Sequence, residues 1–322
     1  MSTRHGIVTL DGTEISFEVF EGAEPAVVIL HGLAGSGREF VPTAQALSGR
    51  KVVLVDQRGH GLSTRRPRDL SRAAFVSDVR AVIERVATSP VVLIGQSMGA
   101  HTAMLVASAH PELVARLILL EGNHGGDNPD NADKLGAYFS SWKTPFADPE
   151  SALADIGDSP IHHAWAADMD AQPDGLRPRF DADIMAESIR PLSLEHWTEW
   201  ERVAAPTLVI YADGGTFTEA QKAEFVERNP FARRVDLAEA SHDAHLDAFD
   251  QWIRAVVTFV DERGRNGSPH AIAVRQASAA AARGRASGRT SCRPRACGPS
   301  RRSRASHAGA GIRCCRTRSP QP

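Results

Sequence analysis

Residues Leu93–Ala100 read LIGQSMGA, an apolar run that passes into small residues at a serine. A short buried strand is therefore expected to turn directly into a helix at Ser97. Gly95 and Gly99 flank Ser97 in the pattern Gly-x-Ser-x-Gly. In such a turn the serine adopts a strained conformation, needs small neighbours and lifts its hydroxyl above the sheet as a nucleophile. A serine that only caps a helix is the alternative.

Short β-branched runs without polar alternation recur along the chain, as expected for strands buried on both faces. They occupy residues 26–30, 51–56, 91–95, 116–121, 207–212 and 233–240. Two earlier strand-like runs within 7–20 flank Asp11-Gly12, a dipeptide that favours a tight hairpin turn. Helical patterns lie between the strands at 73–87, 98–109, 219–228 and 246–262. The alternation predicts an α/β fold with a mostly parallel, eight-stranded, doubly wound sheet.

The alternation breaks between about residues 123 and 200, where Pro, Asp and Gly are frequent and four of the five Trp fall. We interpret 123–200 as an inserted helical cap, and residues 1–122 and 201–263 as the α/β core. Trp165, in the cap, is a candidate for lining the substrate pocket, with packing inside the cap as the alternative.

The end of the chain differs in composition from the rest. Residues 264–322 carry 13 Arg and no Asp or Glu, whereas the preceding part carries 24 basic and 39 acidic side chains. This tail also holds all the cysteines, so no disulfide can crosslink the core: Cys292, Cys297, Cys314 and Cys315. Their spacing matches no standard zinc site. Because the tail has almost no large apolar residues, we predict that it is disordered, and we assign it no function.

Composition also bears on partners and location. An acidic body argues against nucleic acid as a partner, since phosphate binding needs clustered Lys and Arg. No run of about 18 apolar residues is present to span a bilayer. The start, MSTRHGIVTLDG, lacks the apolar segment of a secretory signal, so a cytoplasmic location is expected. Nothing in the sequence indicates an oligomeric state.

Glycine-rich and polar stretches follow several predicted strands. They read HGLAGSG (31–37), DQRGHGLS (56–63), GQSMGA (95–100) and SHDAHLD (241–247). Because the carboxyl ends of parallel strands meet at one edge of a sheet, functional groups gather there. In this order the motifs resemble those of the α/β-hydrolase superfamily, over about residues 5–262. The resemblance implies the fold of that superfamily, with a cap inserted where the alternation breaks.

A serine nucleophile needs a general base and donors for the oxyanion. The order serine, acid, histidine places the base late in the chain, at His242 or His245. We favour His242, because it follows the last strand in a loop and the resemblance implies the first histidine of such a pair. The amide of Met98, at the start of a helix, is expected to face the oxyanion. By resemblance, Leu33 supplies the second amide.

Two carboxylates qualify as the acid that orients the histidine. Asp213 follows the seventh predicted strand, where the superfamily usually carries its acid, though typically one or two residues further along. Glu121 ends the sixth strand, the position used by a minority of families that includes some dehalogenases and lactone hydrolases. An unpaired carboxylate after an apolar run is costly, and a histidine partner would explain it. We favour Glu121, with Asp213 as the alternative.

Together these residues predict acyl transfer to water through an acyl-enzyme, with no metal or organic cofactor. The resemblance implies a carboxylic ester, a lactone or a related carbonyl compound, and the Trp-bearing cap favours a small apolar one. The alternatives are C–C bond hydrolysis or cofactor-free perhydrolysis by the same triad, and a hydrolase-like receptor that senses a ligand.

Overall fold

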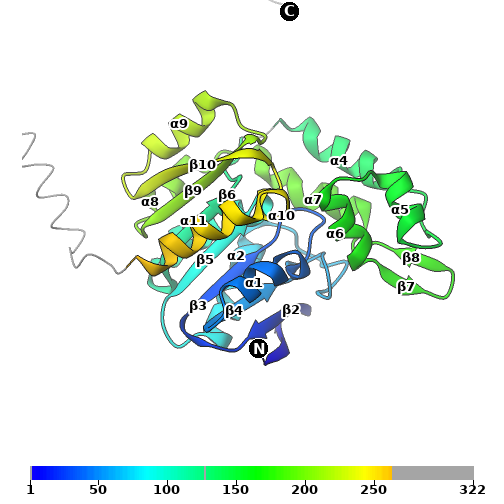
Figure 1. The fold of residues 1–322 in the computed structure, drawn as a ribbon, viewed down its shortest axis with the longest axis horizontal. Coiled ribbons are helices and arrows are strands. Elements are labelled where there is room, and N and C mark those ends of the chain that lie inside the picture. The colour runs from blue at the N-terminus through cyan, green and yellow to red at the C-terminus, as the bar shows by residue number, and fades with distance from the viewer. Residues whose placement is uncertain (1, 127, 263–322) are drawn as a thin grey trace, which may run out of the picture. The chain divides into compact units, whose positions relative to one another are not determined.

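Eight strands form one sheet at the centre of the protein (Figure 1). The structure is a computed structural model that describes residues 2–126 and 128–262, so the predicted tail lies outside the described residues. The sheet order is β1-β2-β4-β3-β5-β6-β9-β10. The strands are β1 (Thr3–Leu10), β2 (Thr13–Phe20), β3 (Ala23–Leu30), β4 (Arg50–Val55), β5 (Val91–Gln96), β6 (Val114–Leu120), β9 (Thr207–Gly214) and β10 (Ala232–Ser241).

The sheet is parallel from β4 to β10 and antiparallel at its other edge. β1 and β2 form the predicted hairpin, in which Asp11 and Gly12 both have positive φ, 49° and 79°. Positive φ at both central residues is what the favoured two-residue hairpin turn requires. β2 pairs antiparallel with β4, and the remaining neighbours pair in parallel. The predicted mostly parallel, eight-stranded sheet is confirmed.

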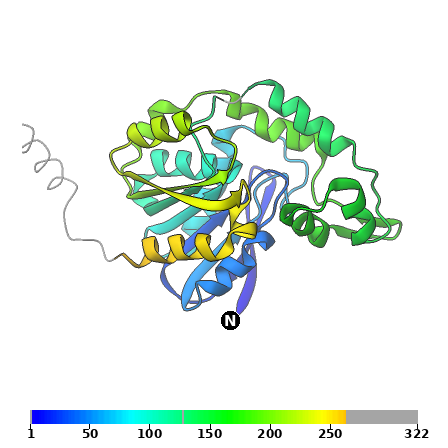
Figure 2. The same cartoon turned by 45° about the horizontal axis from the view of Figure 1, so that its top comes forward.

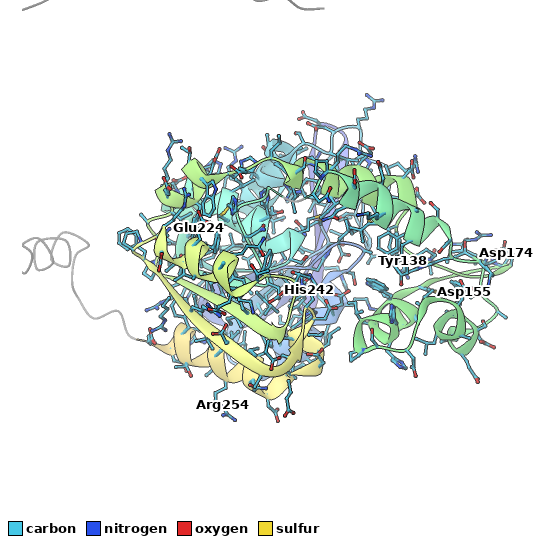
Figure 3. The ribbon with its side chains drawn as sticks, turned by 90° about the horizontal axis from the view of Figure 1, so that it is seen from above. Tyr138, Asp155, Asp174, Glu224, His242 and Arg254 are labelled. Carbon is cyan, nitrogen blue, oxygen red and sulfur yellow. The ribbon has the colours of Figure 1, made fainter. Side chains whose placement is uncertain are left out.

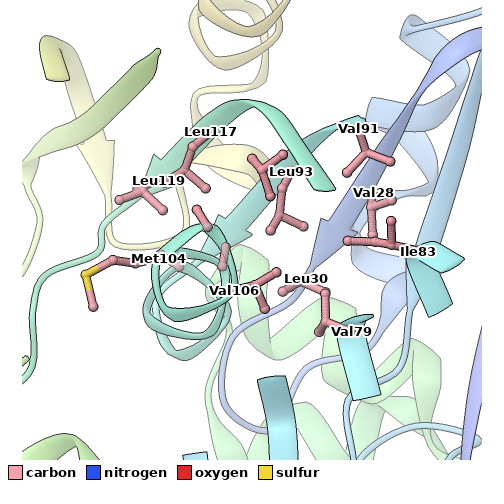
Figure 4. Packing of buried hydrophobic residues seen from close by; sticks show 14 of the residues in the cluster. Val28, Leu30, Val79, Ile83, Val91, Leu93, Met104, Val106, Leu117 and Leu119 are labelled. Atoms are coloured by element: carbon pink, nitrogen blue, oxygen red, sulfur yellow. The ribbon is translucent and has the colours of Figure 1, made fainter. Parts of the chain in front are cut away.

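Helices cover both faces of the sheet, as the doubly wound prediction requires. One face packs against α2 (Arg72–Val86), α3 (Met98–Ala109), α8 (Trp197–Arg202) and α9 (Glu219–Glu227). Figure 4 shows this core, with side chains from β3, β5 and β6 against α2 and α3. The other face packs against α1 (Val41–Ala46), α10 (Ala244–Asp247) and α11 (Phe249–Asp261). Burying each Val or Leu of these clusters contributes about 1.5–3 kcal/mol.

Outside the inserted segment, the structure adds the short helix α1 to the predicted elements and divides the last predicted helix. The expected helix at 246–262 is divided into α10 and α11, because Ala248 leaves the helical region with φ −121° and ψ 38°.

Among the described residues, no helix has the length and apolar character to cross a membrane.

The segment between β6 and β9 has a core of its own. It contains α4 (Asp130–Ser140), α5 (Pro149–Ile156), α6 (Pro160–Asp168), α7 (Ala182–Ile189) and a short hairpin of β7 (Asp170–Gln172) with β8 (Gly175–Arg177). Phe139, Trp142 and Phe180 belong to its buried apolar cluster. Figure 2 shows these elements beside the α/β layers. α8 packs instead with the main core, through the fully buried Trp200.

Ion pairs join this inserted segment to the α/β core. Arg66 contacts Asp181 at 2.7 Å and Asp183 at 2.5 Å, both at the start of α7. Arg38, which precedes α1, contacts Asp168 at the end of α6, at 3.0 Å. The two groups of contacts join the end of α6 and the start of α7, on either side of the β7–β8 hairpin, to the loops that follow β3 and β4.

Candidate active site

Ser97 lies at the sharp turn between β5 and α3, with φ 51° and ψ −118°. This backbone conformation is strained for any residue other than glycine. A Cβ on Gly95 would lie 2.2 Å from the carbonyl oxygen of Gly99, and one on Gly99 would lie 2.4 Å from that of His31. The flanking glycines are therefore required by the close approach of three backbone segments. The turn lifts Ser97 to the edge of the sheet, where it lines a cavity.

The two predicted oxyanion residues line the same cavity as Ser97. Met98 is the first residue of α3, where backbone N–H groups have no partner within the helix. Leu33 belongs to the loop of residues 32–37, which we call the oxyanion loop. The structure thus brings Leu33 and Met98 to the wall where Ser97 lies.

His31 holds the start of the oxyanion loop. Its Nε2 accepts a hydrogen bond from the backbone N–H of Gln57 at 3.0 Å, so its Nδ1–H donates to the carbonyl oxygen of Gly32 at 2.7 Å. Burial lowers the pKa of His31 to about 4, which keeps the imidazole neutral at pH 7. A neutral ring with one donor and one acceptor matches both contacts.

His242 follows β10 and contacts a carboxylate from a distant strand end. Its Nδ1 lies 3.1 Å from Oε2 of Glu121. The His242 side chain is 30% exposed, whereas that of Glu121 is fully buried. With Nδ1–H donating to Glu121, Nε2 is the ring nitrogen that carries the lone pair, which is the tautomer that a general base needs. The structure therefore brings together His242 and Glu121, the pair that the sequence favoured.

Backbone donors hold the Glu121 carboxylate in place. Its Oε1 accepts from the N–H of Ala212 and its Oε2 from the N–H of Thr216, both at 2.9 Å. Burial by itself raises the pKa of Glu121, but the hydrogen bonds from His242, Ala212 and Thr216 lower it below its ordinary value. Glu121 is therefore ionised at pH 7 and able to stabilise an imidazolium.

Asp213, the alternative acid, is placed elsewhere. Its Oδ1 accepts from the N–H groups of Gly214 and Ala240, at 2.8 and 3.0 Å, and its Oδ2 from that of Glu239 at 2.9 Å. Glu239 has a positive φ of 52°, at an irregularity in β10. Asp213 thus braces the end of the strand that leads to His242.

His245 is buried behind the oxyanion loop. Its ring stacks on Phe40, with centroids 4.3 Å apart. Its Nε2 lies 3.5 Å from Oε2 of Glu39. Burial lowers the pKa of His245 to about 4. Glu39, Gln96 and Asp243 line the same cavity as Ser97, although the sequence analysis did not single them out. In the sequence, Glu39 is marked only by its position directly before the apolar residues Phe40 and Val41, just after the HGLAGSG motif. This is a weak indication that a carboxylate is buried.

The cavity at Ser97 has a volume of about 950 Å³, close to the upper end for small-molecule sites. Apolar side chains from the inserted segment line one part: Leu135, Phe139, Ile161, Trp165, Ile189 and Leu192. Polar side chains near α8 and α9 line another: Asn123, His124, Glu195, Gln221, Glu224 and Arg228. In Figure 3, Glu224 of α9 lies on one side of His242, and Tyr138 of α4 in the inserted segment lies on the other. Trp165 therefore lies at the cavity wall, as well as packing edge-to-face on Phe139.

The adjacent histidines of α6 have separate partners. His162 contacts Ser159 and Tyr138, and His163 contacts Asp158. Across residues 2–126 and 128–262, no three His, Cys, Asp or Glu side chains converge as ligands for a metal ion.

Comparison with known proteins places the site in a family. Residues 25–249 match the family model of the alpha/beta hydrolase fold. The sn-1-specific diacylglycerol lipase ABHD11 of Xenopus tropicalis is 38% identical over 267 residues, which is 77% of this chain and 82% of that protein. The 2-(acetamidomethylene)succinate hydrolase of Mesorhizobium japonicum is 25% identical over 250 residues, or 75% of this chain and 90% of that protein.

Solved structures show the same fold. The crystal structure of an E-2-(acetamidomethylene)succinate hydrolase matches with a TM-score of 0.73 at 21% identity, covering 81% of this chain and all of that one. The enol-lactonase of Burkholderia xenovorans LB400 matches with a TM-score of 0.66 at 21% identity, covering 80% of this chain and 100% of that one. The resemblance stated from the motifs is confirmed. The chain belongs to the α/β-hydrolase fold family and is a hydrolase.

Proposed function

We propose that the protein is a serine hydrolase that cleaves a carboxylic ester or lactone through an acyl-enzyme. The observation that carries this proposal is the contact between Nδ1 of His242 and the buried Glu121 carboxylate, in a cavity that Ser97 also lines. An imidazole oriented by a carboxylate, in the same cavity as a serine at a strand-to-helix turn, is the arrangement that acyl transfer needs.

In the proposed reaction, Ser97 Oγ attacks the substrate carbonyl while Nε2 of His242 takes its proton. The amides of Leu33 and Met98 hold the oxyanion of the tetrahedral intermediate. His242 then gives the proton to the leaving alcohol, and the acyl group stays on Ser97. Water attacks the acyl-enzyme with His242 as base, which releases the acid and restores the serine. Glu121 stays ionised and stabilises the imidazolium in both steps.

Residues 123–200 form the proposed cap, and it selects the substrate. Seven apolar side chains of this segment, Trp197 included, line the cavity, which supports binding of an apolar acyl or alcohol group. Polar side chains near α9 line the remainder, which supports a substrate with a polar part as well. The volume of about 950 Å³ accommodates a larger molecule than a simple acetate ester.

The relatives support an ester or lactone. One is named a diacylglycerol lipase, and a structural neighbour is named an enol-lactonase. Both names describe hydrolysis of an ester bond, which is the reaction proposed for Ser97.

The test is turnover of a panel of p-nitrophenyl esters and lactones by the full chain and by Ser97→Ala, together with fluorophosphonate labelling. Steady turnover and labelling in the native protein, both lost in Ser97→Ala, would support the proposal. Turnover that survives in Ser97→Ala would overturn it. Turnover of β-diketones without ester hydrolysis would favour the C–C hydrolase alternative, and labelling without turnover would favour the receptor alternative.

A further inference from the structure

A buried carboxyl group lies against the oxyanion loop. Glu39 follows the loop within the 3-10 turn Gly37–Phe40, and its side chain is 5% exposed. A Cβ added to Gly35 would lie 2.7 Å from Oε1 and 2.9 Å from Oε2 of Glu39. The Glu39 carboxyl also hydrogen-bonds to the backbone of Ser36. The carboxyl group is therefore packed directly on the backbone that follows Leu33.

The same carboxyl group faces the segment that carries the proposed base. Its Oε2 lies 3.5 Å from Nε2 of His245, whose side chain is fully buried and stacked on Phe40. His245 belongs to α10, which begins two residues after His242. Glu39 thus lies between the oxyanion loop and α10, where Nε2 of His245 is buried and has no hydrogen-bond partner among the described residues.

Three acidic groups lie near Glu39, together with the cations Arg38 and Arg179, which lie at 3.0 and 3.7 Å from Asp168. Asp243 at the start of α10, Asp168 at the end of α6 and Asp56 after β4 all act on it electrostatically. Burial, together with these carboxylates, raises the pKa of Glu39 well above its ordinary range. Burial lowers the pKa of His245 to about 4, so its imidazole is uncharged at pH 7, and the raised pKa of Glu39 favours the uncharged form of its carboxyl group.

We propose that Glu39 is a positioning residue for the oxyanion hole, whose buried carboxyl group holds the oxyanion loop against His245 and so fixes the Leu33 amide. A neutral carboxylic acid can donate to Nε2 of a neutral imidazole, whereas a carboxylate cannot. An ionised Glu39 would also place negative charge beside the developing oxyanion, which opposes catalysis in a buried site. This inference rests on the proposed function of Ser97.

Glu39→Gln is the decisive variant, because glutamine has the shape and donor capacity of the uncharged acid but does not ionise. We expect kcat of the wild type to fall at alkaline pH. At pH 7, kcat of Glu39→Gln should equal that of the wild type within about threefold. At alkaline pH, kcat of Glu39→Gln should stay constant. Glu39→Ala removes the carboxyl group, so kcat should fall by up to about 10²-fold, comparable to the loss of one oxyanion donor. KM should change much less, because the contact acts in the transition state.

A second measurement tests the contact with the loop. Gly35→Ala places a methyl group against the Glu39 carboxyl, so it should lower kcat in the wild type but cost nothing further in Glu39→Ala. Such non-additivity indicates direct coupling. Glu18→Gln, a neutralised carboxylate on β2, is the control and should keep the wild-type pH profile.

The inference is overturned if the wild-type profile is flat to pH 10, if Glu39→Gln keeps the alkaline fall, or if the losses from Gly35→Ala and Glu39→Ala add. Should Glu39→Ala fail to fold, the Glu39→Gln profile alone decides. Failure of the proposed function gives a different result: no ester turnover in the wild type, or turnover that survives in Ser97→Ala.

Discussion

The Glu121 carboxylate lies 3.1 Å from Nδ1 of His242, across 121 residues of sequence. Glu121 directly follows β6 and has a positive φ of 49°, and its N–H donates to the carbonyl oxygen of Ile210 on the adjacent strand β9. The backbone turns the side chain toward the loops that follow β9 and β10. The carboxylate beside His242 therefore comes from the end of β6, although the end of the neighbouring strand β9 was the alternative position for it.

We predict that Glu121→Gln lowers kcat by about 10⁴-fold, because the imidazole loses both its orientation and its counter-charge. Asp213→Asn should lower kcat less than about tenfold, since Asp213 contacts backbone N–H groups of β10 rather than the imidazole. Steady-state kinetics on one p-nitrophenyl ester measures both. Equal losses in the two variants would remove the assignment of Glu121 as the acid.

The strained backbone at Ser97 lowers the free energy of unfolding, so a replacement that relieves the strain should stabilise the fold although it removes the nucleophile. Ser97→Gly relieves about 1–3 kcal/mol of strain, less about 0.5–1 kcal/mol for the greater chain entropy of glycine. Ser97→Ala keeps a Cβ and hence the strain. Both variants should be inactive, and urea unfolding should find Ser97→Gly more stable than Ser97→Ala by about 1 kcal/mol.

Ser77 offers the matched comparison, because it lies in the interior of the helix α2 and has no positive φ. There the order should reverse, with glycine less stable than alanine by about 0.5–1 kcal/mol. The same order at both positions would mean that the backbone at residue 97 is not strained.

The parts of the site that are encoded locally could be predicted from the sequence. The pattern around Ser97 is constrained by contacts of Gly95 and Gly99 with neighbouring backbone, so it is visible in one short stretch. The acid is not encoded in this way. β6 and β9 are adjacent and parallel, so Glu121 and Asp213 both end strands at the same edge of the sheet. Only the direction of each side chain separates them, and that depends on backbone angles that no sequence pattern gives.

The inserted segment and Glu39 were less predictable for other physical reasons. β7 and β8 are three residues each, too short for an alternating pattern. The buried cluster around Phe139 and Trp142 forms between elements that follow no regular alternation. Glu39 is buried because α10 folds over it, and α10 lies about two hundred residues later in the chain. A contact of that kind leaves no mark in the neighbouring sequence.

Trp165→Ala should change substrate preference rather than chemistry. Trp165 lines the cavity and packs on Phe139, so its removal takes apolar contact from the substrate. For an octanoyl ester we expect KM to rise about tenfold with kcat nearly unchanged. The lost apolar contact binds the substrate and the transition state equally, so its removal weakens binding without slowing the chemical step. An acetyl ester, which does not reach this wall, should be hydrolysed as by the wild type. Equal effects on both esters would mean that Trp165 acts through folding of the segment.

Buried neutral histidines predict that stability falls as the pH drops below about 6.5. Burial lowers the pKa of His31 to about 4 and that of His60 to about 3. Between these values and the ordinary pKa of histidine, the unfolded chain binds more protons than the folded one, so the free energy of unfolding rises with pH and levels off above about 6.5. His31 alone corresponds to about 3 kcal/mol across this range.

His60→Gln isolates one of these contributions without altering the triad. His60 Nδ1–H donates to the carbonyl oxygen of Arg58, and glutamine can replace that donor. Urea unfolding at pH 7, 6, 5 and 4.5 should give a shallower loss of stability for this variant than for the wild type, even if it is less stable at pH 7. His5→Gln, at an exposed position on β1, should leave the slope unchanged. A wild-type slope retained in His60→Gln would mean that His60 binds its proton equally in both states, which its complete burial argues against.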